Sequence, residues 1–162
     1  MTNSYYSQNE LTALGLCRVG KGVLISKKAS IYQASRLSIG DNVRIDDFCI
    51  LSGTVTLHSH IHISAGVYLF GGNTGITLES FTGISSHSCV YAVSDDFSGH
   101  SLVGSVILNT FKSQNKSPVR IEKYAQLGAR CTILPGVTIA KGCAVGAHSL
   151  LKQSTCSWSI YV

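Results

Sequence analysis

The sequence predicts an all-β domain wound as a parallel β-helix, and a six-residue period is the main observation behind this prediction. Aliphatic residues recur at every sixth position in two blocks, and most are followed four positions later by a small or β-branched residue. A third observation is the glycine that often comes directly after the aliphatic residue, as at Gly40, Gly128 and Gly146. Each unit would form one short strand, and stacked units would bury a continuous core. The two series are Ile39, Ile45, Leu51, Leu57, Ile63, Leu69 and Ile121, Leu127, Ile133, Ile139, Val145, Leu151.

The period divides the single expected domain, residues 1–162, into a cap, coils and one interruption. Residues 1–18 lack the period and are expected to cap the open end of the solenoid, partly as a short helix. Solenoid coils are expected at 19–91 and 119–155, with a small outward loop at the glycine-rich slip 71–77. Residues 92–118 carry no repeat and are too long for an ordinary connection, which predicts an extruded arm that closes over a site.

The composition favours an oligomer that binds a small molecule. The chain is 44% hydrophobic and 13% charged, and its mean hydropathy is +0.24. Large exposed apolar faces are rare on monomers, so we expect the solenoid to pack against copies of itself. The net charge of +5 comes from scattered lysines and arginines without a basic stripe, which argues against nucleic acid as a partner. A mildly positive surface suits an anionic ligand such as a nucleotide, although an ordinary solvated surface would look the same.

The six cysteines indicate neither a metal site nor a redox motif. None of them forms a Cys-x-x-Cys pair, and Cys49, Cys131 and Cys143 fall on the second series of core positions, where cysteine acts as a small hydrophobe. The sequence shows no signal peptide and no apolar run of membrane-spanning length. These features predict a cytoplasmic protein with free thiols and no membrane span.

The last block of repeats reads LGARCTILPGVTIAKGCAVGAHSLL. This stretch resembles the left-handed parallel β-helix acyltransferases of the hexapeptide superfamily, and most closely the sugar O- and N-acetyltransferases of the maltose, galactoside and O-antigen cluster types. SDDFSG at 94–99 is similar to members found in polysaccharide gene clusters. The resemblance implies a left-handed β-helix, a homotrimer with active sites between neighbouring solenoids, acetyl-CoA as acyl donor, and a sugar acceptor. The acceptor group would be a hydroxyl or an amine, including that of a nucleotide-linked sugar in polysaccharide biosynthesis.

The same resemblance implies which positions would contact the donor. Ala129 in LGAR and Ala147 in VGAH match the small residues that lie beside the thioester and the pantetheine arm of CoA in the family. Lys152 and Gln153 follow directly beyond the last matching coil and complete this expected CoA-binding edge. Each alanine also has a simpler interpretation as an ordinary core or corner residue of the solenoid.

Acyl transfer from a thioester requires a base that takes the proton of the attacking group. The sugar acetyltransferases place a catalytic histidine shortly after the coil that precedes the arm, and the matching position here is Asp95. A carboxylate suits an amino sugar, although acidic residues at the start of a loop often only form a turn. His87 lies in the coil just before the arm and is the first candidate for a histidine base, ahead of His100 and His148. The predicted catalytic residues are therefore His87 and Asp95.

The sequence is also compatible with two other functions. The run LHSHIHIS at 57–64 would place His58, His60 and His62 on one face of a strand, as a metal site would require. A γ-type carbonic anhydrase-like zinc hydratase shares the β-helix, but the His-x-x-x-x-His pair of that family is absent, and we predict no metal. A non-enzymatic β-helix scaffold is the second alternative, and the long polar arm at 92–118 argues against it.

Overall fold

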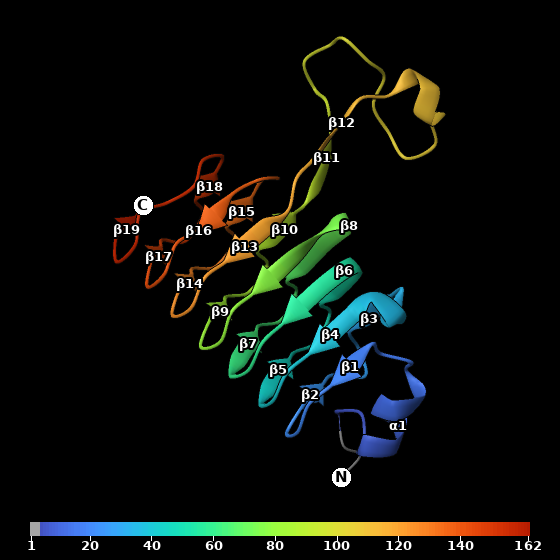
Figure 1. Cartoon of the computed structure of the whole chain (residues 1–162), viewed down its shortest axis with the longest axis vertical. Helices are drawn as coiled ribbons and strands as arrows, with labels where there is room; N and C mark the ends of the chain where they lie inside the picture. The colour runs from blue at the N-terminus through green and yellow to red at the C-terminus, as the bar shows by residue number, and fades with distance from the viewer. Residues whose placement is uncertain (1–3) are drawn as a thin grey trace.

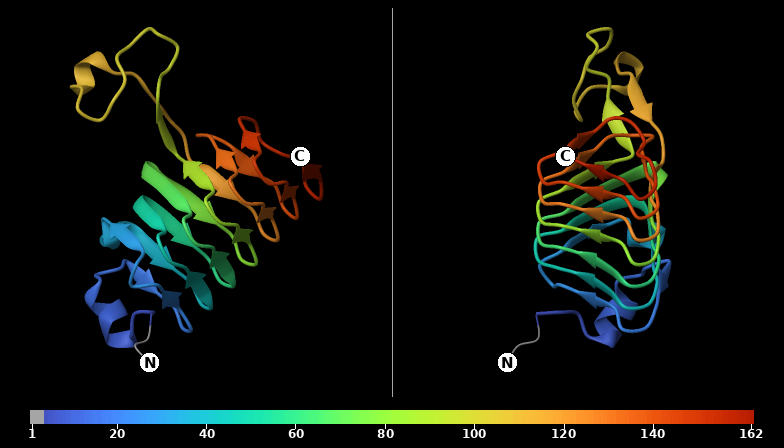
Figure 2. Two further views of the ribbon diagram at one scale, coloured as in Figure 1. Left: turned by 180° about the vertical axis from the view of Figure 1, so that it is seen from behind. Right: turned by 90° about the vertical axis from the view of Figure 1, so that its left-hand side faces the viewer.

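The structure, a computed structural model, describes residues 4–162. The chain winds as a left-handed parallel β-helix, a column of stacked coils with a short helix at one end and an arm that projects near the other (Figures 1 and 2). Every strand pair within the column is parallel, and each strand pairs with the strands one coil before and after it. The predicted fold class is therefore confirmed.

The strands stack into three walls, which we call A, B and C. Wall A contains β2 (Leu24–Ile25), β5 (Val43–Ile45), β7 (Ile61–Ile63), β9 (Gly83–Ile84), β14 (Gln126–Leu127), β17 (Ala144–Val145) and β19 (Ile160–Tyr161). Wall B contains β3 (Ser30–Tyr32), the first parts of β6 (Ile50–Leu57) and β8 (Tyr68–Leu78), β10 (Cys89–Tyr91), β15 (Thr132–Ile133) and β18 (Leu150–Leu151). Wall C contains β1 (Arg18–Val19), β4 (Leu37–Ile39), the second parts of β6 and β8, β13 (Val119–Ile121) and β16 (Thr138–Ile139).

Three edges join the walls. The chain runs from wall A to wall B to wall C and back, so the AB, BC and CA edges each collect one turn from every coil. Several of these turns use the left-handed backbone without glycine, as at His60 (φ 60°) and His87 (φ 61°). Such a conformation is uncommon for a residue with a side chain and turns the chain sharply. The edges therefore hold side chains at fixed positions above and below one another.

The core consists of the aliphatic residues that define the six-residue period. On wall A, for example, residues at the same position pair in register from coil to coil: Ile45, Ile63, Ile84, Leu127 and Val145. All of them are buried, as are Cys49, Cys131 and Cys143 at the second position of the repeat. The period thus stacks like residues on one another inside the column, as predicted.

The glycine-rich slip does not form the outward loop that we expected. Residues 71–77 lie within β8, which continues around the BC edge from wall B to wall C. The adjacent coil passes so close that a Cβ atom at Gly71 would lie 2.0 Å from the carbonyl oxygen of Thr54. The glycines therefore serve close packing between coils rather than a loop.

The two ends of the column differ. At the N-terminal end, α1 (Gln8–Ala13) begins with a capping box between Ser7 and Glu10 and buries Leu11 against the first coils. A 3₁₀ turn, η1 (Ala34–Arg36), fills the BC edge of the next coil. In the part of the chain that the structure describes, no helix is long and apolar enough to cross a membrane.

The arm leaves the BC edge after β10 and returns before β13. Its base is a two-stranded antiparallel ribbon of β11 (Val93–Asp95) and β12 (Gln114–Lys116), and its tip contains η2 (Asn109–Phe111). The arm projects away from its own column (Figure 1). The coils on either side keep their register, since β8 pairs with β13 and β10 pairs with β15.

Candidate active site

His87 and its neighbour Ser85 lie in the turn after β9, on the AB edge. His87 is exposed, and its ring covers Gly66 in the coil before it. A Cβ atom at Gly66 would lie 2.6 Å from Nδ1 of His87, so the glycine leaves room for the ring in this position. The predicted histidine therefore packs on the backbone of the neighbouring coil at this corner.

The two predicted CoA-contacting alanines continue the same edge in the next coils. Ala129 is half-buried and Ala147 is exposed, and the backbone N–H of His148 donates to the carbonyl oxygen of Ala129 at 2.8 Å. A Cβ atom at Gly128 would lie 2.6 Å from the backbone nitrogen of Ala147, which shows how closely the two turns approach. Ala129 and Ala147 thus form a strip of small residues on the AB edge, beyond His87 in the direction of the C-terminus and beside the exposed Arg130 and His148.

Asp95 lies on the BC edge, at the end of β11 in the base of the arm. Its Oδ1 accepts a hydrogen bond from Nε2 of Gln114 at 2.8 Å, and its Oδ2 accepts one from the backbone N–H of Gly104 at 2.8 Å. The Gln114 hydrogen bond, followed by that of Gly104, lowers the pKa of Asp95 below its ordinary value. The side chain is therefore a held, ionised carboxylate at neutral pH.

Two adjoining clefts meet at Asp95. One, of about 450 Å³, has mostly apolar walls that include Tyr91, Phe97 and Leu134. The other, of about 430 Å³, is also lined by Asp95 and extends to Lys152 of the last wall B coil. Gln153 follows Lys152 and is exposed. The structure thus brings a predicted catalytic carboxylate and a predicted CoA-binding lysine to the same edge.

The predicted site residues form two groups within one chain. His87, Ala129 and Ala147 share the AB edge, whereas Asp95 and Lys152 share the BC edge. Wall B separates the two edges: the clefts at Asp95 contain none of the AB-edge residues, and the cleft that includes Ala147 contains neither Asp95 nor Lys152. A single column therefore holds the two halves of the predicted site apart.

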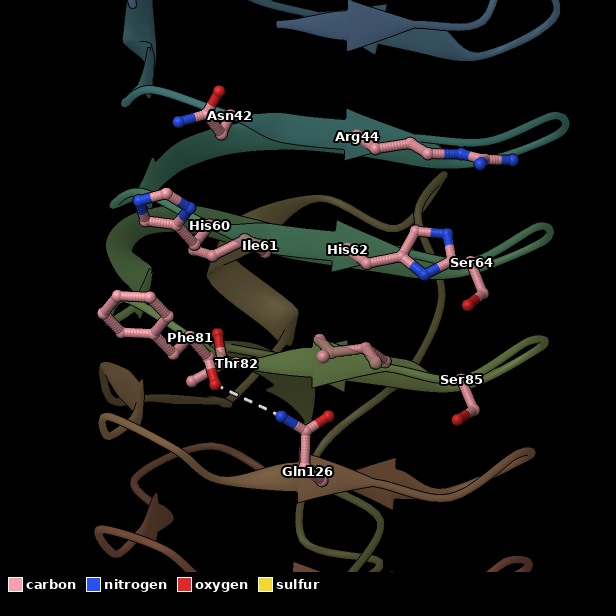
Figure 3. A pocket seen from close by; sticks show the side chains of 12 residues that line it. Asn42, Arg44, His60, Ile61, His62, Ser64, Phe81, Thr82, Ser85 and Gln126 are labelled. Atoms are coloured by element: carbon pink, nitrogen blue, oxygen red, sulfur yellow. Dashed lines mark hydrogen bonds between the residues drawn. The ribbon is translucent and has the colours of Figure 1, made fainter. Parts of the chain in front are cut away.

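A further groove, of about 520 Å³, runs across wall A and was not predicted from the sequence (Figure 3). Arg44, His62 and Ser85 line it in three successive coils near the AB edge, while His60 and Phe81 lie toward the CA edge (Figure 3). His60 and His62 come from the run LHSHIHIS at 57–64, which we interpreted as a possible metal site, and the other residues belong to no local motif. Only the outward position in each repeat could have indicated them.

One carboxylate organises the polar end of this groove. Oδ1 of Asp46 accepts from Nε of Arg44 at 2.7 Å, and Oδ2 lies 2.7 Å from Nε2 of His62. The Asp46 side chain is 16% exposed, whereas those of Arg44 and His62 are about half exposed. Burial alone would raise the pKa of Asp46, but the hydrogen bonds and charges of His62 and Arg44 together outweigh burial and lower it.

The prediction that three histidines alternate along one strand is wrong. β6 ends at Leu57 and β7 begins at Ile61, so His58 and His60 lie in the CA-edge turn and only His62 points outward from a strand. The His60 ring stacks on Phe81 with centroids 4.7 Å apart. Within residues 4–162, no cluster of three His, Cys, Asp or Glu side chains could hold a metal ion.

Comparison with known proteins identifies the repeat. The family described as bacterial transferase hexapeptide (six repeats) matches residues 118–153. The chain is also similar to the dTDP-4-amino-4,6-dideoxy-D-glucose acyltransferase of Escherichia coli. The two are 32% identical over 162 residues, which cover 98% of this chain and 84% of that enzyme.

Solved structures extend the similarity to the whole fold. AntD, an N-acyltransferase from Bacillus cereus in complex with dTDP and 3-hydroxybutyryl-CoA, is 52% identical with a TM-score of 0.96. The match covers 98% of this chain and 85% of AntD. An AntD variant in complex with dTDP-4-amino-4,6-dideoxyglucose and coenzyme A is 51% identical with a TM-score of 0.97. That match covers 98% of this chain and 86% of the variant.

Variants of AntD point to two of its side chains. Some solved forms carry a substitution of one serine, and others carry a substitution of an aspartate ten residues further along that chain. The similarity extends over nearly the full length of this chain at both the sequence and the structural level. The chain belongs to the hexapeptide-repeat acyltransferase family, and it is an enzyme that takes its acyl group from a CoA thioester.

Proposed function

We propose that this enzyme transfers an acetyl group from acetyl-CoA to the 4-amino group of dTDP-4-amino-4,6-dideoxyglucose or a closely related nucleotide-linked amino sugar. The observation that carries the proposal is the near full-length similarity to AntD, which binds that sugar nucleotide together with coenzyme A. The carboxylate at position 95 agrees with an amine acceptor, because an amine needs less activation than a hydroxyl. A longer acyl group is the competing outcome, since AntD also binds 3-hydroxybutyryl-CoA.

We further infer a homotrimer, and the character of wall B supports it. The outward residues of wall A and wall C are mostly polar or small, as at Arg44, Gln126 and Thr77. The outward residues of wall B are largely aromatic or aliphatic: Tyr32, Ile50, Tyr68, Phe70, Tyr91 and Leu150. A continuous apolar face of this kind is unfavourable in water and is normally covered. Wall B therefore faces the threefold axis in the proposed assembly.

This arrangement unites the two halves of the site. When three parallel columns turn wall B toward a common axis, the AB edge of one column meets the BC edge of the next. Ser85 and His87 of one subunit then lie near Asp95 of its neighbour. The spacing agrees with AntD, because Asp95 stands ten residues after Ser85 just as the altered aspartate stands ten residues after the altered serine there.

The proposed reaction assigns a role to each group. The amine nitrogen attacks the thioester carbonyl carbon, the carboxylate of Asp95 accepts the proton lost by the nitrogen, and the C–S bond breaks to release CoA as a thiolate that is then protonated. Ser85 holds the acceptor across the cleft, and His87 borders the same corner. Ala129 and Ala147 let the pantetheine arm lie close to the backbone, while Lys152 and Gln153 of the neighbouring subunit contact its polar end.

The test is release of free CoA in a thiol assay with purified dTDP-amino sugar and with a panel of unlinked sugars. We expect turnover of the nucleotide-linked amino sugar alone. Removing a general base typically costs a factor of about 10² to 10⁴, so Asp95→Asn should fall in that range and Ser85→Ala should weaken the enzyme less. Asp96→Asn should stay near wild type, since the ten-residue spacing from Ser85 that matches AntD selects Asp95 and not its neighbour. If Asp95→Asn is fully active and His87→Ala is inactive, the base is the histidine instead.

A further inference from the structure

Within residues 4–162, the lining of the groove on wall A contains basic side chains and no carboxylate. Among the described residues that line it, Arg44, His60 and His62 are basic and none is acidic. Asp46 lies behind Arg44 and His62 and bonds one nitrogen of each. This carboxylate orients both side chains, and the Tyr5 ring, whose centroid lies 5.8 Å from Cζ of Arg44, packs against the guanidinium as well. An orienting anion behind two basic groups is a suitable arrangement for a phosphate ligand.

The groove has a defined position relative to the acceptor's reacting end. Ser85 lines it, and Ile84 beside Ser85 pairs with Ile63 of β7, which in turn pairs with Ile45 of β5. Adjacent strands are about 5 Å apart, so Arg44 lies about 10 Å along the column from the level of Ser85. That distance suits a hexose and the diphosphate attached to it.

The expected donor site sets the direction in which the acceptor must extend. The strip of Ala129 and Ala147 continues from Ser85 toward the C-terminal end of the column. If CoA occupies that strip, the acceptor meets it near Ser85 and its remaining atoms run toward the N-terminal coils. Arg44 and His62 lie on that side, at the AB-edge end of the groove (Figure 3).

We propose that Arg44 and His62, oriented by Asp46, bind the diphosphate of the nucleotide-linked acceptor on wall A. This inference rests on the proposed function, because it places the substrate assigned there. Arg44 is suited to contact both phosphates, since a guanidinium presents several donors in one plane. His62 adds a second donor one coil closer to the sugar.

The experiment measures dTDP affinity of the full-length enzyme by calorimetry. We expect Arg44→Gln to weaken dTDP binding at least tenfold and His62→Gln at least threefold, with little change in affinity for CoA. Thymidine, which lacks phosphate, should bind equally weakly to all three proteins. Arg120→Gln is the matched control: like Arg44, Arg120 is an exposed arginine paired with a carboxylate, Glu79, but it lies on wall C, so this variant should bind dTDP like wild type.

The outcomes separate the two proposals. If wild type binds dTDP and Arg44→Gln binds it equally well, the diphosphate lies elsewhere and this inference alone is overturned. If wild type binds no dTDP and acylates no dTDP-amino sugar, the proposed function falls together with it. Should Arg44→Gln fold poorly, Arg44→Lys keeps the charge near Asp46 but loses the planar fork. A loss of dTDP affinity in that variant, with an unchanged thermal midpoint, would still support the assignment.

Discussion

The period that defines the fold predicts that substituting an inward-facing leucine and an outward-facing leucine will have very different effects on stability. Leu69 is fully buried in β8 and pairs in register with Leu51 and Val90, whereas Leu24 in β2 is 44% exposed on the outside of wall A. Leu69→Ala would remove buried methyl groups and leave a cavity between coils that the stacked backbone cannot close. A buried leucine-to-alanine change costs about 3 kcal/mol of the free energy of unfolding, and a surface change about 0.5 kcal/mol or less.

Urea unfolding at one fixed protein concentration provides the measurement, since the proposed assembly would make the apparent stability concentration-dependent. Leu69→Ala should unfold at a much lower urea concentration than wild type, with Leu24→Ala close to wild type. Circular dichroism of both variants should show the same strand content before unfolding. Equal midpoints for the two variants would refute the argument that the inward positions of the repeat provide the stability of the column.

Three further predictions follow from local interactions. Hydrogen bonds from Lys27 and from the helix N-cap residue Ser7 lower the pKa of Glu10 to about 2. Glu10→Gln should therefore destabilise the protein at neutral pH. The difference in unfolding free energy between this variant and wild type should disappear as the pH falls from about 4.5 to 2 in acid titrations. Cys17 and Cys156 are exposed and should react rapidly with a thiol reagent, whereas the buried cysteines should not. The signal from these two thiols is the background to subtract in the CoA assay. Slow reaction at both would contradict the exposed positions of Cys17 and Cys156. The hydrogen bond from Gln114 lowers the pKa of Asp95, so Gln114→Ala should raise that pKa and move the acid limb of the kcat/KM profile to higher pH. An unchanged pH profile would argue against Asp95 as the base.

Much of the column could be predicted because the positions of the inward residues follow from the short spacing between them along the chain. Each inward residue, such as Ile45 or Ile133, is fixed by its spacing from the next one along the chain. The three histidines were misplaced for an equally local reason. Strand alternation holds only within β7, which begins at Ile61, and a left-handed turn at His60 interrupts it. Because a residue other than glycine forms this corner, the sequence does not mark where the strand ends.

The groove on wall A could not be predicted because its residues meet across coils. Arg44 and His62 belong to different repeats, and each looks like an ordinary outward residue of its own strand. Only the register of β5 on β7 brings them to the same carboxylate, Asp46. Ser85 was missed in the same way, since serine at a corner is common and its position over Arg44 and His62 depends on the stacking.

The arm carries a candidate catalytic residue, yet the stacking of the coils does not depend on the arm. β8 pairs with β13 and β10 pairs with β15 as though the intervening residues were a simple turn, so the column does not depend on the contents of the arm. The base of the arm is nevertheless rigid, because β11 and β12 pair and Gln114 holds Asp95 across them. A carboxylate is thereby fixed at the base of the arm, outside the core of its own column, where a ligand or a neighbouring subunit can reach it. The aromatic outer face of wall B beside it favours the neighbour, because the proposed threefold contact would cover that face and would bring Asp95 to the adjacent subunit.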